Sequence, residues 1–466
     1  MDLSQENFRG QLATVGKEGK RNWVYPKKPK GLFHNYRKVV AWILLTLFFS
    51  GPFISIGGQP LLLFNIFDRK FVILGSVFWP QDTHLLIFLL LIFVVFILLF
   101  TVIFGRVWCG WACPQTIFME MVFRKIEYWI EGNANQQRKL NAAPWNFEKV
   151  WKKTIKQLIF ISIALAVAHT FMAYLLGLEE MKTIILSGPT AHKSGFIGLL
   201  FFTAIFYFVF AYFREQVCTL VCPYGRLQGA FLDKKSIVVI YDWIRGEPRG
   251  KRKKNTPTPV KGDCIDCGLC VQVCPTGIDI RNGTQMECVN CTACIDACDE
   301  VMEKIQRPKK LIRFDSIEGV EIKRKSLFTT RVLAYSFILC LLILSMGYLL
   351  ISRAPVEASL TRTPGAIYQM KGDSLISNMY QLELVNKSFD AHHIAIEVMD
   401  DHASIFLPAG RLDSLQAQAK STIYFFVEVP VNKAKQLNEK ATIHIKMDSK
   451  ALETIKTSFP IPPSLK

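Results

Sequence analysis

Two runs of cysteine between positions 264 and 298 share the spacing C-x2-C-x2-C-x3-C. The first run consists of Cys264, Cys267, Cys270 and Cys274, and the second of Cys288, Cys291, Cys294 and Cys298. This spacing is typical of bacterial two-cluster ferredoxins, in which thiolates hold two [4Fe–4S] clusters and the fourth cysteine of each run ligates the other cluster. Zinc sites instead pair short C-x2-C knuckles across a longer gap. The eight cysteines therefore predict two [4Fe–4S] clusters and one-electron chemistry.

The two runs differ at the position that follows the last cysteine. Pro275 follows Cys274, whereas Asp299 follows Cys298. All eight ligands remain in place, so we expect this difference to change only the local turn.

A second pattern, R-x2-C-x3-C-P, occurs twice nearer the N-terminus. Arg106, Cys109, Cys113 and Pro114 match Arg214, Cys218, Cys222 and Pro223, which indicates an internal repeat. If the chain stays helical there, each cysteine pair is spaced i, i+4 and lies on one helix face. The alternative is that these cysteines are small buried residues that pack helices. Nearby arginine favours the thiolate, which binds soft ions such as Cu(I) or iron–sulfur clusters, and the sequence leaves these two ligands open.

The composition indicates that these motifs belong to a membrane protein. Half of the 466 residues are hydrophobic, 35 of them are Phe, and the mean hydropathy is positive. Five segments approach the roughly 20 apolar residues that a membrane span needs. They are Val39–Ile56, Leu85–Phe104, Ile155–Leu176, Phe196–Phe213 and Val332–Ile351. The net charge of +18 lies mainly beside these segments, which favours contact with anionic lipid rather than with nucleic acid.

The distribution of Lys and Arg predicts the orientation of the five spans. Residues 1–38 carry nine, 105–154 carry eight and 214–330 carry twenty, whereas 57–84 and 177–195 carry two each. The positive-inside rule then places the N-terminus and both cysteine motifs in the cytoplasm and the C-terminal segment outside. Cytoplasmic thiols stay reduced, so disulfides are excluded for the twelve motif cysteines.

Three further segments carry structural signals. Residues 57–84 contain two short apolar runs and predict an interfacial hairpin rather than a sixth helix. Residues 115–132 have apolar side chains at helical spacing and predict a helix along the cytoplasmic membrane surface. Residues 352–466 contain alternating runs about ten residues apart, the pattern of a β-sandwich, in which the histidines read as structural residues and no nucleophile–base pair stands out.

The order of these parts closely resembles one family, the FixG/RdxA/CcoG accessory proteins of the cbb-type cytochrome c oxidase. The resemblance rests on the basic N-terminus, both C-x3-C-P motifs, the paired ferredoxin runs and a fifth span before an external domain. It implies a five-helix α transmembrane bundle, an inserted cytoplasmic two-[4Fe–4S] ferredoxin-like domain and a C-terminal immunoglobulin-like β-sandwich in the bacterial inner membrane. The expected divisions are 1–38 (basic N-terminus), 39–244 (four spans with both C-x3-C-P motifs), 245–330 (basic linker and ferredoxin-like domain), 331–351 (fifth span) and 352–466 (periplasmic domain).

The same resemblance implies a membrane-bound cupric reductase that supplies Cu(I) to the oxidase or its copper-delivery factors. Cys264, Cys267, Cys270 and Cys298 would ligate one cluster, and Cys288, Cys291, Cys294 and Cys274 the other. Cys109, Cys113, Cys218 and Cys222 would handle copper or its last electron, fed by a cytoplasmic donor that the sequence does not identify. Two alternatives remain open: a quinol-linked electron conduit, and a copper-binding assembly scaffold without enzymatic activity.

Overall fold

The computed structural model describes residues 14–15, 20–251, 262–323, 328–363, 368–372, 374–400, 402–408, 414–437, 440–448 and 450–463. Most of the N-terminal segment before residue 20 and residues 252–261 of the predicted basic linker lie outside these ranges. The chain forms two compact units. The first comprises Met1–Ile54 and His84–Met346, and the second comprises Ser55–Thr83 and Gly347–Lys466.

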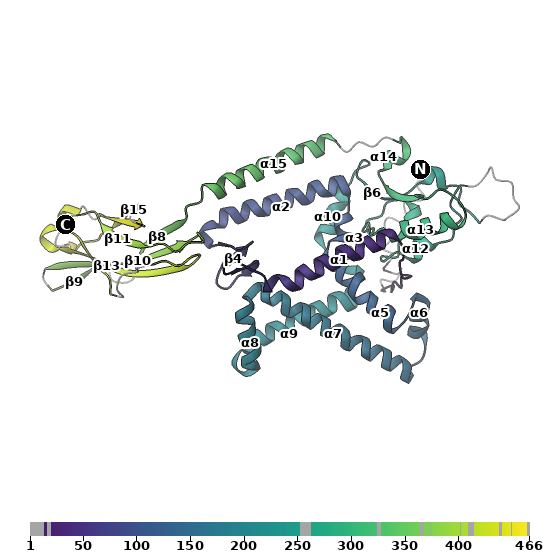
Figure 1. Cartoon of the computed structure of the whole chain (residues 1–466), viewed down its shortest axis with the longest axis horizontal. Coiled ribbons are helices and arrows are strands. Elements are labelled where there is room, and N and C mark those ends of the chain that lie inside the picture. The colour runs from purple at the N-terminus through teal and green to yellow at the C-terminus, as the bar shows by residue number, and fades with distance from the viewer. Residues whose placement is uncertain are drawn as a thin grey trace. The chain divides into compact units, whose positions relative to one another are not determined.

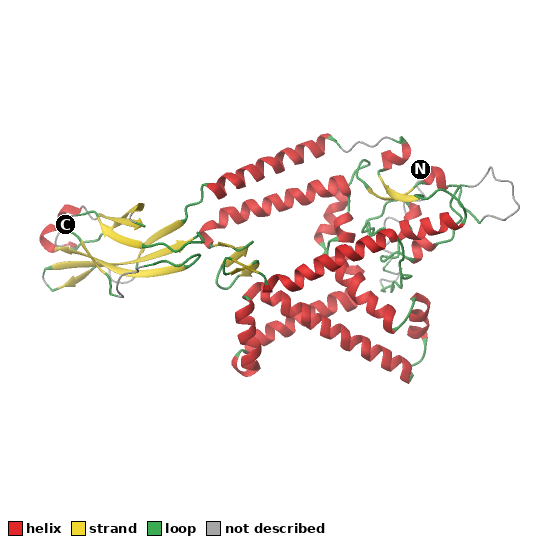
Figure 2. Ribbon diagram, in the orientation of Figure 1, coloured by secondary structure: helices red, strands yellow, loops and turns green. Residues whose placement is uncertain are grey.

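The first unit is built mainly of helices (Figures 1 and 2). Its membrane-associated part contains α1 (Leu32–Ser50), α2 (Thr83–Phe104), α3 (Val107–Trp111), α4 (Pro114–Ile117), a π-helical turn η4 (Phe118–Phe123), α5 (Arg124–Ile130), α6 (Ala134–Ala142), α7 (Phe147–Leu176), α8 (Leu178–Ala191), α9 (Lys193–Tyr207), the π-helical turns η5 (Phe208–Phe213) and η6 (Val217–Val221), and α10 (Pro223–Phe231). Helix α7 packs along α9, and both contribute to an aromatic core around Phe160 and Phe210.

Four helices in the described part of the chain are long and apolar enough to cross a membrane. They are Pro80–Phe104, Phe147–Leu176, Lys193–Phe213 and Thr330–Ile351, the last of which is α15. The predicted span Val39–Ile56 has the wrong bounds, because α1 ends at Ser50 and is followed by a 3-10 turn and a short strand. The chain is thus an integral membrane protein with four candidate spans, and a fifth crossing by α1 stays a prediction.

The helix predicted over residues 115–132 is present as α4, η4 and α5 in succession. Its apolar face packs inside the protein, with Phe118 and Phe123 against α7 and η5, and Met121 against α1. Trp129, in contrast, is largely exposed. The sequence analysis assigned these helically spaced apolar side chains to contact with a membrane surface. Most of them instead pack against neighbouring helices.

The ferredoxin-like module lies in the first unit and is framed by a two-stranded antiparallel ladder of β6 (Val238–Tyr241) and β7 (Ile312–Asp315). Between the strands lie α11 (Trp243–Gly246), α12 (Leu269–Gln272), a 3-10 turn η7 (Ile280–Asn282) and α13 (Ala293–Lys304), and α14 (Ile317–Glu321) follows. The two cysteine runs share one backbone pattern, since positive φ values occur at Asp266 and Gly268 in the first run and at Asn290 and Thr292 in the second.

The residue that follows the last cysteine of each run has a clear effect on the helix there. Helix α12 ends at Gln272, two residues before the Cys274–Pro275 pair, because the residue before a proline disfavours helical geometry. The second run has Asp299 instead of proline, and α13 continues through Cys298 to Lys304. The runs therefore present similar ligand loops but helices of unequal length.

The second unit contains the predicted β-sandwich (Figure 2, yellow). One sheet has the order β12 (Ser404–Phe406), β13 (Lys420–Pro430), β10 (Leu375–Asn386), β8 (Val356–Arg362), with β9 (Gln369–Lys371) also pairing with β10. The other sheet has the order β11 (Ile394–Val398), β14 (Lys440–Met447), β15 (Lys450–Ser458), and a 3-10 helix η8 (Val431–Leu437) follows β13. Alternate residues of β10 and β13 fill the core, where Tyr380 pairs with Phe425. The alternating runs predicted in residues 352–466 are thus present as strands.

The hairpin predicted in residues 57–84 is present and is followed by a third strand. β3 (Leu62–Asn65), β4 (Lys70–Ile73) and β5 (Ser76–Phe78) form an antiparallel meander, preceded by the short strands β1 (Ser55–Ile56) and β2 (Gln59–Pro60) and followed by the turn η3 (Pro80–Asp82). Leu74 and Gly75 both have positive φ, as a two-residue type I′ turn requires. The buried carboxylate of Asp82 joins this meander to the sandwich, since it lies 2.6 Å from Arg353 Nη2 and 2.7 Å from Lys387 Nζ.

Removing the charge of Asp82 should destabilise the second unit. In Asp82→Asn, two largely buried cations face a neutral amide, and loss of one partner from a buried ion pair costs about 3 kcal/mol. Pulse proteolysis of the full chain over a urea series measures the free energy of unfolding. The control Glu397→Gln breaks a more exposed pair with Lys446, for which a loss below about 1 kcal/mol is expected. Equal losses in the two variants would contradict the assigned role.

Candidate functional site

One cavity of the ferredoxin-like module is lined by cysteines of both runs. Its volume is about 370 Å³, and its cysteines are Cys264, Cys267, Cys270 and Cys298. The first three come from the first run and the fourth from the end of the second. The remaining wall is mainly apolar, with Leu311 and Met302 among the lining residues.

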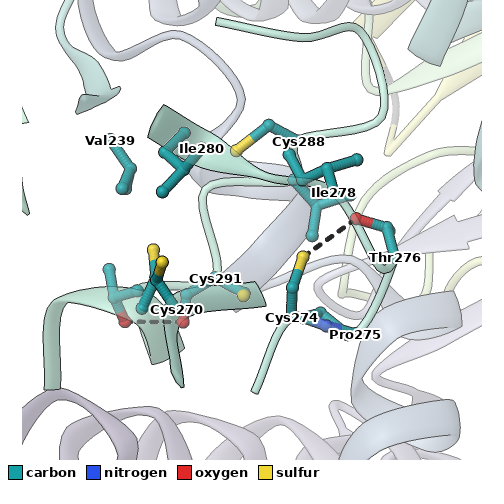
Figure 3. Close-up of a pocket in the computed structure, with 12 residues that line it drawn as sticks. Val239, Cys270, Cys274, Pro275, Thr276, Ile278, Ile280, Cys288 and Cys291 are labelled. Atoms are coloured by element: carbon teal, nitrogen blue, oxygen red, sulfur yellow. Dashed lines mark hydrogen bonds between the residues drawn. The ribbon is translucent and has the colours of Figure 1, made fainter. Parts of the chain in front are cut away.

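In the second cavity, of about 350 Å³, the two cysteine runs have the opposite roles. It is lined by Cys288, Cys291 and Cys294 of the second run and by Cys274 of the first, and Cys270 borders both cavities. Figure 3 shows several of these thiols around the cavity, where Cys274 Sγ lies 3.3 Å from the Thr276 hydroxyl. The fourth cysteine of each run thus lies with three cysteines of the other, as the two-cluster pattern predicts.

The side chains around the two cavities fit [4Fe–4S] clusters. Among the described residues, no group of three His, Cys, Asp or Glu side chains is arranged to hold a single metal ion. Four thiols spread around a larger apolar space match a cluster, whose protein ligands are thiolates. Burial raises the pKa of Cys270, Cys288 and Cys298 to about 12, so cluster binding at these thiols releases protons. Ligation by the individual cysteines stays a prediction.

The sequence left open whether the chain stays helical at the duplicated C-x3-C-P motifs, and the structure shows a helix break in each. Cys109 lies in α3 and Cys218 in the π-helical turn η6, but Cys113 and Cys222 lie beyond the ends of these elements in extended backbone. The following Pro114 and Pro223 begin the next helices, α4 and α10. Because a proline disfavours helical geometry at the preceding residue, each cysteine pair straddles a helix break rather than sharing one helix face.

The structure nevertheless brings the four motif cysteines into one neighbourhood. Electrostatic interactions link Cys218 to Cys109, Cys113 and Cys222, and burial raises the pKa of Cys218 to about 12. Burial also raises the pKa of Cys109 and outweighs the opposing effect of Arg106. Arg106 favours the thiolate of Cys109, as expected, but desolvation is the larger effect, so the net result is a raised pKa.

The two motif arginines connect the halves of the repeat. Arg106 Nε donates to Gln228 Oε1 (2.8 Å), on the helix that follows the second motif. Arg214 forms an ion pair with Glu127 (2.5 Å), on the helix that follows the first motif. Cys109 Sγ lies 3.3 Å from the same Gln228 oxygen. Each arginine thus positions the region that follows the other motif.

The first motif packs directly against the second cluster cavity. Cys109 belongs to a buried apolar cluster with Val289, Cys291 and Ala293, against which Cys294 also packs. Gly110 makes this contact possible, because a Cβ atom there would lie 2.4 Å from Val289 O and 3.0 Å from the Cys291 nitrogen. The buried Arg37 of α1 donates to Gly110 O at 2.6 Å and holds the contact from the other side.

Two further polar contacts fasten the ferredoxin-like module to the helices. The Asp296 carboxylate accepts hydrogen bonds from the Phe33 and His34 amides (3.1 and 2.8 Å) at the start of α1. The buried Arg124 donates to Pro275 O (3.1 Å), beside Cys274, and pairs with the buried Glu215 (3.2 Å). The sequence did not reveal these contacts, because Asp296 and Arg124 are not motif residues and the partners named here lie 91 or more positions away.

The sandwich contains a histidine network that the sequence did not reveal. His392 Nε2 lies 2.9 Å from Ser388 Oγ, and His392 Nδ1 lies 2.6 Å from Asp448 Oδ2. The Ser388 hydroxyl also lies 2.8 Å from Asn386 Oδ1 and 3.0 Å from Asp390 O. The serine thus ties the turn after β10, and Ser388, His392 and Asp448 form a hydroxyl–imidazole–carboxylate arrangement, whereas no nucleophile–base pair stood out in the sequence.

Comparisons with known proteins agree with this arrangement. The chain is 35% identical to the protein RdxB of Cereibacter sphaeroides over 397 residues, which cover 82% of this chain and 83% of that protein. The chain belongs to the FixG/RdxA/RdxB family. RdxA of the same organism is 32% identical over 81% of this chain and 82% of its own length. The nitrogen fixation protein FixG of Rhizobium meliloti is 30% identical over 84% of this chain and 82% of its own length.

Three family models match successive parts of this FixG-family chain. A 4Fe–4S binding domain matches residues 86–133, a 4Fe–4S dicluster domain matches 213–317, and the IG-like fold at the C-terminus of FixG, described as an oxidoreductase, matches 346–462. A crystal structure of a FixG-related protein from Vibrio parahaemolyticus matches 23% of this chain and 96% of its own length, at 13% identity and a TM-score of 0.19. The chain is thus a FixG-family iron–sulfur membrane protein with an immunoglobulin-like C-terminal domain.

Replacement of Cys274 should empty one cluster site and leave the other occupied. Because Cys274 lines only the second cavity, Cys274→Ala should lose about four of about eight irons per chain. Iron and acid-labile sulfide analysis of the anaerobically purified protein measures the loss. Cys340→Ala, at an exposed cysteine in α15 outside both motifs, is the matched control. Unchanged iron content in Cys274→Ala would contradict the ligand assignment.

A methyl group at Gly110 should separate α3 from the second cysteine run. Gly110→Ala forces Val289 O and the added Cβ apart, and such overpacking costs about 1–3 kcal/mol. We expect faster loss of iron to a chelator, followed as bleaching of the cluster absorbance. The matched control is Gly347→Ala, because nothing lies within 4 Å of a Cβ at that helical position. Bleaching at the same rate in both variants would show that the close contact is unimportant.

Proposed function

We propose that this FixG-family protein is a membrane-bound cupric reductase that converts Cu(II) to Cu(I) for assembly of a cbb-type cytochrome c oxidase. The observation that carries the proposal is the packing of Cys109 against Cys291 and Cys294. It places a second group of thiols beside a site suited to an electron carrier. The choice of copper as the electron acceptor, and of the cbb-type oxidase as its destination, rests on the resemblance to the oxidase accessory proteins.

The chemistry of the residues supports copper as the substrate. When bound, [4Fe–4S] clusters supply electrons one at a time, and the reaction Cu(II) + e⁻ → Cu(I) consumes one. The product ion prefers thiolate ligands, whereas Cu(II) is held well by imidazole and carboxylate. Cys109, Cys113, Cys218 and Cys222 provide four thiols in one neighbourhood, of which no three are arranged in this structure to hold a single ion. Because burial keeps Cys109 and Cys218 protonated, each thiol that binds Cu(I) gives up a proton.

In this proposal an electron passes from the second cysteine run to the C-x3-C-P cysteines, and the residues packed between them set the distance. Cys109 and Tyr224, the latter on α10 directly after Cys222–Pro223, pack in the same apolar cluster as Cys291. Gly110 allows the backbones to approach closely, and Arg37 and Gln228 fix the orientation of α3. This packing excludes water from the intervening space, which favours transfer to the motif thiols over side reactions.

The proposal also includes a position in the membrane and partners. The excess of Lys and Arg beside the cysteine motifs supports placing the ferredoxin-like module in the cytoplasm of a bacterial cell, where a soluble donor would reduce it. A fifth crossing by α1 would then put the C-terminal sandwich in the periplasm, available to the oxidase or to its copper-delivery factors.

A second candidate assigns the motif cysteines to a third iron–sulfur cluster. The match of a 4Fe–4S binding domain to residues 86–133 favours it, because this segment contains Cys109 and Cys113. In that case the protein would conduct electrons from another donor, such as a quinol, to an acceptor other than copper. Iron content separates the two candidates, since loss of the motif cysteines removes about four irons only if they hold a cluster.

The copper proposal is tested with a variant that lacks all four motif thiols. Anaerobically reduced protein is mixed with Cu(II) and a chelator specific for Cu(I), and the chelate absorbance is followed. The variant with Cys109, Cys113, Cys218 and Cys222 changed to Ser should lose at least tenfold in rate but keep its cluster absorbance, because the two cavities retain their cysteines. Cys340→Ser is the matched control and should react like the unmodified protein.

The outcomes of this test separate the candidates. Equal chelate formation by the four-serine variant and the unmodified protein would contradict the proposal. Copper binding without chelate formation would indicate an assembly scaffold that leaves the valence unchanged. Bleaching of the oxidised clusters by added quinol, with no chelate formation from Cu(II), would favour the quinol-linked conduit.

A further inference from the structure

A large cationic cavity in the first unit has no part in the chemistry described above. It lies between the start of α1, the segment before α1, and the η4–α5 helix. Its basic lining residues are Lys28, Lys30, Arg37, Lys38 and Lys125. The single carboxylate among the described lining residues, Glu120, is already paired with Arg124. The cavity therefore carries an excess of positive charge.

The positively charged side chains that line the cavity repel one another. Burial lowers the pKa of Lys125, and the neighbouring charges of Lys38 and Lys28 lower it further. Burial, followed by the charges of Lys38 and Arg37, lowers the pKa of His34 to about 4. His34 Nδ1 is also buried without a hydrogen-bond partner. A bound anion would relieve the repulsion between these cations, whereas a free metal cation would increase it.

The surroundings of the cavity indicate which kind of anion fits. Lys38 is the last basic residue of α1, and the helix continues with Val39, Trp42 and Ile43, each more than half exposed. Trp129, a lining residue, is 79% exposed. A step from several cations to an exposed apolar helix face is the arrangement at the boundary between lipid headgroups and acyl chains, where basic pockets bind anionic headgroups.

We propose that this cavity binds the phosphate group of an anionic membrane phospholipid, with the acyl chains along the apolar face of α1. The site is formed by Lys28, Lys30, Lys38 and Lys125, and Arg37 closes its inner end. Arg37 also donates to Gly110 O at 2.6 Å, so a lipid held here braces α1 against α3. The proposal is independent of the reaction at the cysteines and would stand if copper were not the substrate.

The test uses full-length protein with its clusters, purified in an uncharged detergent. Short-chain phosphatidylglycerol is titrated, and its binding is measured by native mass spectrometry and by the shift in the midpoint of thermal unfolding. A ligand that binds only the folded state raises this midpoint in proportion to its affinity. Short-chain phosphatidylcholine tests the need for net negative charge, and sn-glycerol 3-phosphate tests whether the headgroup suffices without acyl chains.

The variant Lys38→Gln with Lys125→Gln removes two charges from the cavity. The matched control Arg138→Gln with Lys139→Gln removes the same charge from exposed positions of α6. We expect phosphatidylglycerol to bind at least tenfold more weakly to the cavity variant, with unchanged binding to the control variant. Cluster absorbance checks that both variants are folded.

Three results would overturn the proposal. Equal affinity of the cavity variant and the unmodified protein would show that the phosphate binds elsewhere. Equal binding of phosphatidylcholine and phosphatidylglycerol would show that the negative charge is not recognised. Binding of sn-glycerol 3-phosphate as tight as that of the lipid would assign the cavity to a soluble phosphate ester rather than to a membrane lipid.

Discussion

The close approach of two backbones, at Gly110 and at the Val289–Cys291 loop, is the contact on which the first unit depends. A Cβ atom at residue 110 would lie 2.4 Å from Val289 O, so only glycine permits this distance without a shift. The contact joins the first C-x3-C-P motif to the second cysteine run and makes Cys109 part of the wall around that run. Without this close approach, Cys109 would not lie beside the cysteines of the second run.

Two polar contacts join the ferredoxin-like module to the helices, and a third joins α1 to α3 beside the close approach. Arg37 binds the carbonyl of Gly110 itself, Asp296 caps the start of α1, and Arg124 binds the carbonyl beside Cys274. All three side chains are buried, and an arginine in such a place is stable only if its donors are satisfied. Their combined effect is to fix the ferredoxin-like module on helices that also carry the motif cysteines. Helix α1 takes part in two of the three contacts and also borders the cationic cavity.

Much of this architecture can be predicted from the sequence, because periodic patterns reflect local geometry. The repeated cysteine spacing predicted which cysteines share a cavity, and alternation in β10 and β13 predicted the sandwich. The bounds of the first span were wrong, because α1 ends at Ser50 although apolar residues continue beyond it. The C-x3-C pairs would share one helix face only if the chain stayed helical, and the following prolines break the helices. Asp296, Arg124 and Gly110 contact residues that are distant in the chain. Such contacts depend on the tertiary fold and produce no recognisable pattern in the local sequence.

If the protein is a cupric reductase, copper reaches the motif thiols and is reduced there. X-ray absorption at the copper K-edge, after one equivalent of Cu(II) is added to the anaerobically reduced protein, reports the valence and the ligands of copper in a single experiment. Reduction at the motif thiols should give a Cu(I) edge with a sulfur coordination shell. This shell should be absent from the variant in which Cys109, Cys113, Cys218 and Cys222 are changed to Ser. A Cu(II) edge with nitrogen and oxygen ligands, unchanged by loss of these cysteines, would contradict it.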